Sequence, residues 1–303
     1  MTPRIRPFQP ADAPAVAAVA RAAQPQVVTS VAGFRRRFSA GAAGDLPATF
    51  VAEYDGTVTG YAAVEPDWFS AASGHTYVRL AVHPEHRGRG VGTALADAVE
   101  RRLRVLEPVA TRLWGADDDT SRAFARRYGF AEHGESRAQR LDLGMLPPAP
   151  PTPAGVRLLR YADFADDPRP LHEIETACLA DEPSAVSFDG LSYDVWRDRL
   201  WDDPDLDREL SLVALLDGRA VGVAAITTDD RHACASAFTG TVSAARGRGL
   251  AGYTKTVALH QARERGVRTA FTVNDAGNGP MLAINARLGY RPFATEVLHT
   301  RAG

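Results

Sequence analysis

Two short segments rich in arginine and glycine are the parts of this chain best suited to chemistry. The first is Arg87-Gly88-Arg89-Gly90 and the second is Arg246-Gly247-Arg248-Gly249, and each leads directly into apolar residues at helical spacing. Glycine lets a backbone approach a phosphate closely, and the first N–H groups of a helix are free to bind an anion. Arginine adds charge-assisted hydrogen bonds. Both segments therefore predict a site for a phosphate or a diphosphate.

Two common nucleotide-binding motifs do not fit these segments. A Walker loop ends in Gly-Lys-Ser or Gly-Lys-Thr, and neither segment has that ending. The dinucleotide pattern Gly-x-Gly-x-x-Gly fits the second segment, with Gly252 in third place, but Thr93 occupies that place in the first. The acidic residue expected about 20 positions later is also missing, since Phe271 and Thr272 stand there. Triphosphate hydrolysis and dinucleotide binding are therefore disfavoured.

The two segments belong to an internal duplication of the chain. Residues 50–64 align with residues 211–226, and each stretch has an Asp-Gly pair between alternating apolar residues, which predicts a hairpin. Tyr128-Gly129-Phe130 aligns with Leu288-Gly289-Tyr290 at a similar distance after the glycine loop. Because the order and the spacing of these segments agree, we predict two copies of one structural unit.

Each copy is predicted to be a mixed α/β domain. The expected order of elements is strand, one or two helices, hairpin, strand, glycine-rich turn, helix, strand, helix and strand, which gives a mixed central sheet flanked by helices. The elements expected around the glycine turns are strands at 76–82, 110–115 and 269–274 and helices at 90–106, 120–128 and 280–288. A proline-rich segment, 147–154, is interpreted as a semi-rigid linker between domains at 1–146 and 155–303.

The composition of the 303 residues is that of a globular protein, with 45% hydrophobic and 24% charged residues. A net charge of −2 disfavours binding to nucleic acid or to an anionic membrane. The two cysteines, Cys178 and Cys234, offer neither a disulfide framework nor the spacing of a metal site. We therefore expect a cytoplasmic monomer or homodimer that has no metal and no nucleic-acid or membrane partner.

These motifs resemble the GNAT superfamily of N-acetyltransferases, whose signature Gln/Arg-x-x-Gly-x-Gly/Ala fits both glycine loops. The resemblance extends over nearly the whole chain, including HPEHRGRGVGTAL at 83–95 and NDAGNGPMLAINARLGYRPF at 274–293. The tandem arrangement is similar to that of mycothiol synthase-like acyltransferases. The resemblance implies transfer of an acyl group from acetyl-CoA to the primary amine of a small molecule, by direct attack of the amine on the thioester.

The resemblance also implies the residues that bind coenzyme A: strand ends for the pantetheine arm and thioester carbonyl, and the loops for the pyrophosphate. In the first half they are Leu80, Ala81, Val82, Arg87, Gly88, Arg89, Gly90, Val91 and Gly92. In the second half they are Thr239, Gly240, Thr241, Arg246, Gly247, Arg248, Gly249, Leu250, Ala251 and Asn278. Asp118 corresponds to Asn278 and would place a carboxylate near an anionic ligand, so the second site is expected to be the more complete.

The groups that transfer protons are less well defined. Members of the family frequently have a tyrosine, the acid for the departing thiolate, four residues before the glycine of the Leu-Gly-Phe/Tyr motif. Ala125 and Asn285 occupy that position here. The candidates for a catalytic role are Tyr128 in the first half and Tyr253, Asn285 or a water in the second. The candidate bases are Glu53, His75 and His232.

The absence of that tyrosine keeps a second hypothesis open. One or both domains could retain the coenzyme loop but lack turnover, and serve a structural or sensing role. Transfer of the acetyl group of acetyl-CoA to an amine distinguishes the two hypotheses, because a binding module would hold the coenzyme without releasing its thiol.

Overall fold

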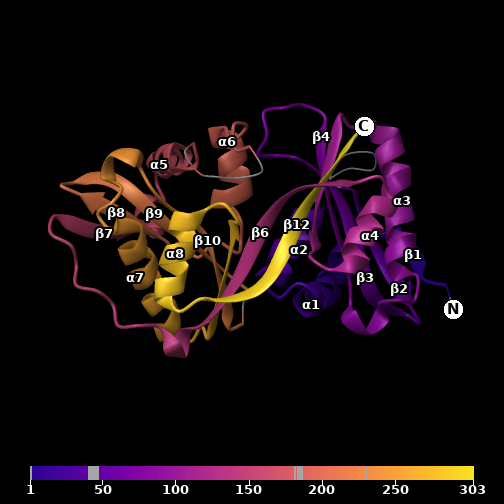
Figure 1. Cartoon of the computed structure of the whole chain (residues 1–303), viewed down its shortest axis with the longest axis horizontal. Coiled ribbons are helices and arrows are strands. Elements are labelled where there is room, and N and C mark those ends of the chain that lie inside the picture. The colour runs from indigo at the N-terminus through magenta and orange to yellow at the C-terminus, as the bar shows by residue number, and fades with distance from the viewer. Residues whose placement is uncertain (1, 40–47, 181, 183–186, 230) are drawn as a thin grey trace. The chain divides into compact units, whose positions relative to one another are not determined.

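The computed structural model describes residues 2–39, 48–180, 182, 187–229 and 231–303 (Figure 1). The chain divides into two compact units. Unit 1 consists of Met1–Glu135 with Thr295–Gly303, and unit 2 consists of Ser136–Ala294. Within the described residues, no helix is long and apolar enough to cross a membrane, and no group of three or more His, Cys, Asp and Glu residues could hold a metal ion.

Unit 1 is a mixed sheet with the strand order β1-β2-β3-β4-β5-β12, in which β4 and β5 are parallel and the other pairs are antiparallel. Its strands are β1 (Arg4–Pro7), β2 (Ala48–Tyr54), β3 (Thr57–Pro66), β4 (His75–Val82), β5 (Ala110–Ala116) and the end of β12 (Arg291–Ala302). Its helices are α1 (Ala13–Ala23), α2 (Val31–Ser39), α3 (Val91–Leu106) and α4 (Asp119–Arg127). Because successive side chains of a strand point to opposite faces, Tyr61 and Ala63 of β3 pack with α1 and α2, whereas Ala62 and Val64 pack with α3.

Unit 2 repeats this plan with the strand order β7-β8-β9-β10-β11-β6, in which β10 and β11 are the parallel pair. Its strands are β7 (Val156–Arg160), β8 (Leu212–Leu216), β9 (Arg219–Thr228), β10 (Ala233–Thr241), β11 (Thr269–Asp275) and the end of β6 (Ala131–Asp142). Its helices are α5 (Arg169–Leu179), α6 (Tyr193–Trp196), α7 (Leu250–Glu264) and α8 (Gly279–Leu288). Leu259 of α7 and Ile226 of β9 share the main apolar core. The mixed α/β fold with helices beside a mixed sheet is confirmed.

The last strand of each sheet comes from the other half of the chain. Residues Ser136–Asp142 of β6 pair with β11 in unit 2, and residues Glu296–Ala302 of β12 pair with β5 in unit 1. The compact units therefore differ from the predicted boundaries of 1–146 and 155–303. Alternation of apolar residues predicts that a segment is a strand, but not which of two equivalent sheet edges it joins. That residues 1–146 and residues 155–303 each fold alone stays a prediction.

Both predicted Asp-Gly hairpins are confirmed. Asp55 and Gly56 have φ values of 54° and 72°, and Asp217 and Gly218 have φ values of 51° and 82°. Two successive residues with positive φ suit the tight turn whose twist matches the flanking antiparallel strands. The turns therefore set the registers of β2 with β3 and of β8 with β9.

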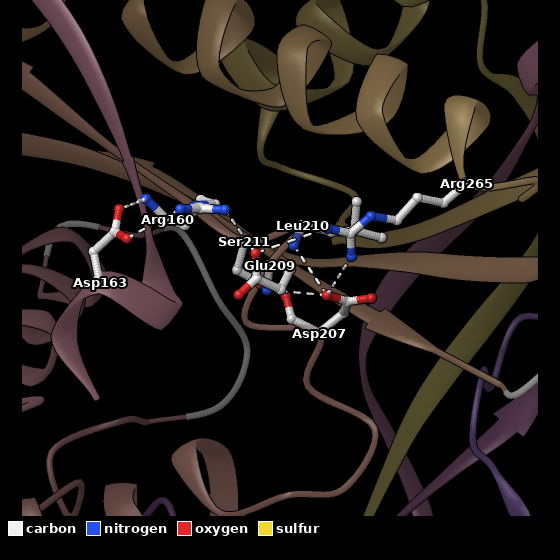
Figure 2. Close-up of polar contacts among 7 residues, drawn as sticks. All are labelled: Arg160, Asp163, Asp207, Glu209, Leu210, Ser211 and Arg265. Atoms are coloured by element: carbon white, nitrogen blue, oxygen red, sulfur yellow. Dashed lines mark hydrogen bonds and ion pairs between the residues drawn. The ribbon is translucent and has the colours of Figure 1, made fainter. Parts of the chain in front are cut away.

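A polar network holds the acidic segment that leads into β8 (Figure 2). Asp207 Oδ1 accepts the backbone N–H groups of Glu209 and Leu210 at 3.0 Å each, and lies 3.5 Å from an Arg265 guanidinium nitrogen. Glu209 Oε2 in turn accepts a 2.9 Å hydrogen bond from Arg160 at the end of β7. These acidic groups stabilise the loop and join it to β7 and α7.

Candidate active site

Each unit carries its arginine-glycine loop between a strand and a helix, as the sequence predicts. Gly88 and Gly90 have φ values of 72° and 82°, and Gly247 and Gly249 have φ values of 77° and 74°. A Cβ atom placed on any of the four would meet nothing within 4 Å. Gly90 and Gly249 precede α3 and α7, and neither has a side chain to cap its helix. The first N–H groups of both helices therefore lack a side-chain acceptor from the cap position.

The loop of unit 2 lines a cavity of about 1050 Å³. This volume is at the upper end of the range for sites that bind small molecules and cofactors. The residues predicted for the second coenzyme site all line this cavity: Thr239, Gly240, Thr241, Arg246, Gly247, Arg248, Gly249, Leu250, Ala251 and Asn278. The structure thus brings the end of β10, the glycine loop and the beginnings of α7 and α8 together around one space.

The strands beside the cavity separate toward their ends. β10 and β11 pair in parallel only from Ala233 with Thr269 to Ala235 with Phe271, although β10 continues to Thr241. The register of β10 with β9 shifts between Ser236 and Phe238, which is a β-bulge. A bulge leaves a residue outside the regular hydrogen-bond ladder and redirects the strand. The bulge lies next to Phe238, Thr239 and Gly240, which line the cavity.

The corresponding strand of unit 1 is regular. β3 and β4 pair in an unbroken register from Gly60 with Val82 to Pro66 with Thr76. β4 and β5 also separate, since their parallel pairing ends at Val78. The first unit therefore has the glycine loop and the strand separation, but a continuous ladder where the second unit has a bulge.

The proline-rich segment forms a wall of the cavity in unit 2. Its prolines 147, 148, 150, 151 and 153 all line the space. The hydroxyl of Tyr253 on α7 donates a 2.9 Å hydrogen bond to Thr152 Oγ1, and a ring nitrogen of His260 lies 2.9 Å from the Pro147 carbonyl oxygen. The segment 147–154, interpreted as a semi-rigid linker, therefore also lines the cavity. An extended proline run has no apolar periodicity, so the sequence contains no signal for the surface that it covers.

Asn278 and Asp118 have equivalent places in the two units. Each precedes the helix after the second parallel strand and accepts a backbone N–H with its side-chain oxygen, from Met281 at 3.3 Å and from Ser121 at 2.8 Å. Their correspondence is thus a structural one. At this cap position unit 2 has a neutral amide in the cavity wall, whereas unit 1 has a carboxylate.

The three catalytic candidates have different surroundings. Tyr253 lines the cavity, with its hydroxyl hydrogen-bonded to Thr152. Tyr128 of unit 1 donates to an Asp97 carboxylate oxygen at 3.1 Å, and burial together with this carboxylate raises the pKa of its phenol. Asn285 is fully buried and lies outside the residues that line the cavity. The structure therefore brings only Tyr253 of these three candidates to the cavity.

Asn285 belongs to a buried polar network with Lys255, which is the only lysine of the chain. Lys255 Nζ donates a 2.7 Å hydrogen bond to Asn285 Oδ1 and lies 5.1 Å from the centre of the Tyr290 ring. The Asn285 amide donates to Gln139 and to Asn274, at 2.9 and 2.8 Å. Burial lowers the pKa of the Lys255 amine to about 7. The sequence signal for this network is a single lysine, Lys255, at a position inside the apolar pattern of a helix.

The buried amine should make unfolding depend on pH. The unfolded chain binds a proton at Lys255 up to a pKa of 10.5, whereas the folded chain loses it near 7. Stability should therefore rise from pH 7 to about pH 9, by roughly 1.4 kcal/mol per pH unit at most. Above pH 9.0 the buried Cys234 opposes the rise, because folding raises the pKa of its thiol to about 12.

Urea unfolding at half-unit pH steps tests this in the wild type and in Lys255→Met. In Lys255→Met the urea midpoint of unfolding should no longer rise between pH 7 and pH 9. Arg263→Met, which removes an exposed cation from the same helix, should retain it. A wild-type midpoint that stays constant or falls from pH 7 to 9 would show that the amine is charged in the folded protein.

Two cavity-lining residues that motif reasoning missed are Cys178 on α5 and Glu182, three residues after the end of that helix, which together form the α5 wall of the cavity. Helix α5 approaches β10 so closely that a Cβ atom on Gly240 would lie 2.5 Å from Cys178 Cβ. Glu175 anchors the helix, since its carboxylate accepts hydrogen bonds of 2.5 Å from the Tyr161 hydroxyl and from Trp196 Nε1. Burial raises the pKa of the Glu175 carboxyl. Gly240 therefore permits close packing, in addition to its predicted place beside the coenzyme.

Comparison with known proteins gives the same assignment for both halves. Residues 21–130 and 171–290 match the model of the acetyltransferase (GNAT) family. The chain is 29% identical over 262 residues to a mycothiol acetyltransferase of Mycolicibacterium vanbaalenii, covering 84% of this chain and 82% of the relative. A mycothiol acetyltransferase of Nocardia farcinica is 28% identical over 260 residues, with the same two coverages.

Solved structures with the same fold extend along nearly the whole chain. A GCN5-related N-acetyltransferase from Sphaerobacter thermophilus has a TM-score of 0.73 at 23% identity, covering 99% of this chain and 95% of its own. A tandem GNAT protein from the clavulanic acid biosynthesis pathway has a TM-score of 0.74 at 20% identity, covering 99% and 98%. The duplicated glycine loops, the separating parallel strands and the family match over most of the sequence agree: the chain belongs to the GNAT family of acetyltransferases and is an acyl-CoA-dependent N-acyltransferase.

Proposed function

We propose that the chain transfers the acetyl group of acetyl-CoA to the primary amine of a small molecule, and that unit 2 carries the reaction. The observation that carries this proposal is the cavity of unit 2, where a helix N-terminus, a bulged strand end and three arginines surround one space. The same features suit the three parts of the donor, which are the diphosphate, the pantetheine arm and the thioester.

The diphosphate would lie on the loop from Arg246 to Gly252. Glycine at 247 and 249 leaves room for its oxygens beside the N–H groups at the start of α7. Arg246, Arg248 and Arg287 bring positive charge to the same cavity, and a 3.1 Å hydrogen bond from Arg246 Nε to the Thr241 carbonyl holds that side chain at the loop. We infer that unit 2 recognises the coenzyme chiefly through this diphosphate.

The thioester would lie at the end of β10, where Thr239–Thr241 line the cavity beside the bulge. The amine nitrogen attacks the carbonyl carbon, and backbone N–H groups released from the ladder stabilise the oxyanion that develops. The N–C bond forms, the C–S bond breaks, and the attacking nitrogen gives up a proton to a water or to a base of the site. The thiolate takes its proton from Tyr253 or from a water, and the products are an amide and free coenzyme A.

The acceptor is inferred to be a small molecule, because α5 and the proline-rich segment wall the cavity. Relatives that align with most of the chain are named mycothiol acetyltransferases, so a mycothiol-related amine is the first acceptor to test. The two cysteines are free and buried, which fits the reducing cytoplasm, where we place the enzyme as a monomer or homodimer.

Unit 1 is proposed to contribute less to turnover. Its predicted residues Leu80–Val82 and Arg87–Gly92 keep the order of the coenzyme site. However, the carboxylate of Asp118 caps α4, and that of Asp97 lies on α3 beside the Tyr128 hydroxyl. Negative charges near the path of an anionic coenzyme weaken binding.

Paired substitutions should show this difference. Arg246→Ala with Asn278→Ala should lower turnover about 10-fold or more relative to Arg87→Ala with Asp118→Ala, since each charge-assisted contact contributes about 1.5 kcal/mol or more. The measurement is acceptor-dependent release of coenzyme thiol, with the same acceptor for all variants. Greater loss in the unit 1 pair would reverse the assignment and make Tyr128 the acid to test.

A further inference from the structure

The cavity of unit 2 has an uneven distribution of charge. Its charged lining residues, within the part of the chain that the structure describes, are Arg246, Arg248, Arg287 and Glu182. The arginines belong to the glycine loop and to α8, which surround the proposed diphosphate. Glu182 lies three residues after the end of α5, and its N–H donates to the Leu179 carbonyl in the last turn of that helix at 3.0 Å. One wall is therefore cationic, and the α5 wall carries a carboxylate.

Glu182 lines the same cavity as Cys178, which marks its proposed acyl end. Cys178, four residues earlier in the chain, packs directly against Gly240 in β10. Gly240 is part of the strand end where the thioester carbonyl is proposed to lie. An acceptor amine that reaches this carbonyl from the α5 side would pass Glu182, whereas the diphosphate at the loop would not.

The surroundings of Glu182 favour its protonated form more than water does. Burial raises the pKa of its carboxyl above the ordinary value, and the negative charge of Asp275 at the end of β11 raises it further. The Cys178 thiol is the other titratable side chain of the α5 wall in the cavity. A carboxylate with a raised pKa accepts a proton more readily than an exposed one, which suits a general base.

We propose that Glu182 is the general base of the acyl transfer and that it selects a cationic primary amine as acceptor. Its carboxylate binds the ammonium form of the acceptor and removes a proton from the nitrogen that attacks the thioester. The N–C bond forms and the C–S bond breaks. The ammonium nitrogen loses two protons: one resides on Glu182, and the other reaches the departing thiolate through Tyr253 or a water, so that the coenzyme leaves as the thiol. Asp275 adds to the attraction for a cation and disfavours acceptors with an acidic group beside the amine. This inference rests on the proposed function of unit 2.

Glu182→Gln in the full chain tests the base, because it keeps the shape of the side chain and removes its basicity. With acetyl-CoA and a panel of amines that includes glucosamine, ethanolamine and a mycothiol-related amine, kcat/KM at pH 7 should fall about 100-fold or more. The Kd of acetyl-CoA by calorimetry should not change. Glu173→Gln, on an exposed position of α5, is the matched control and should behave as the wild type in both measurements.

The pH profile separates a catalytic role from a structural one. Wild-type kcat/KM should fall as the pH is lowered through the raised pKa of Glu182, whereas Glu182→Gln should lack this fall and follow only the ionisation of the acceptor. Wild-type rates in Glu182→Gln, or a kcat/KM of that variant that still falls at low pH, would show that Glu182 is not the base. The proposed function would then stand without it. If the wild type binds acetyl-CoA but acetylates no amine of the panel, the proposed function and the base are both overturned.

Discussion

Gly249→Val should abolish the binding of acetyl-CoA to the cavity of unit 2. Gly249 has a φ of 74°, a region that a β-branched residue adopts only with strain. The new side chain would also occupy the open space in front of α7 where the diphosphate is proposed to lie. We expect Kd for this site to rise about 100-fold or more, and turnover to fall with it, since several charge-assisted hydrogen bonds are lost together. Calorimetric titration of the full-length variant gives both the affinity and the number of sites.

Gly266→Val is the matched control for backbone strain. Gly266 has a φ of 87°, and a Cβ atom there also meets nothing within 4 Å, but it follows the end of α7 and does not line the cavity. This variant should lose stability and keep its affinity for acetyl-CoA. Normal binding of acetyl-CoA by Gly249→Val would contradict the loop assignment. Equal loss of affinity in both variants would show that backbone strain alone causes the loss.

Removal of residues 295–303 should unfold unit 1 and spare the cavity of unit 2. These residues supply the strand that pairs with β5, from Glu296 with Ala116 to Ala302 with Ala110. Val297 and Leu298 are buried, and burial of each such side chain contributes about 1.5–3 kcal/mol. Arg301 also bonds Glu100 and the Tyr128 carbonyl at 2.9 and 2.5 Å. The combined loss is comparable with the whole stability of a small domain.

Hydrogen exchange followed by mass spectrometry locates this effect. Peptides from β4 and β5 should lose protection, while peptides from β10 and β11 keep it, and acetyl-CoA should still protect the loop at 246–252. Leu298→Ala should cause the same pattern to a smaller degree, by about 2–5 kcal/mol, whereas Val105→Ala, at a position 73% exposed in the same unit, should cause almost none. Uniform loss of protection across both units would show that the strand stabilises the chain as a whole.

Local patterns predicted the parts of the site that depend on short stretches of chain. The glycine loops follow from residues that require positive φ, and both occur before the expected helices. The Asp-Gly hairpins follow in the same way from their turn residues. The correspondence of Asn278 with Asp118 was visible in the aligned repeats, since each residue begins an equivalent helix.

Features that depend on contacts between distant segments could not be predicted. The bulge in β10 requires knowledge of its register with β9, and the place of Glu182 in the cavity wall requires knowledge of how α5 packs on Gly240. Asn285 matches the position of a family tyrosine, but it turns to the buried Lys255 instead of the cavity. Among the candidate bases, Glu53 of unit 1 forms an ion pair with Arg6, with 2.7 Å between Glu53 Oε1 and a guanidinium nitrogen of Arg6.

A crystal structure of the full chain with bound coenzyme A tests whether unit 2 holds the coenzyme. We expect the diphosphate on the backbone N–H groups at 247–252 of unit 2, the pantetheine arm along Thr239–Thr241, and the thiol beside Phe238 and the α5 wall. Coenzyme bound in unit 1 with the cavity of unit 2 empty, or a coenzyme whose thiol points away from the end of β10, would contradict it.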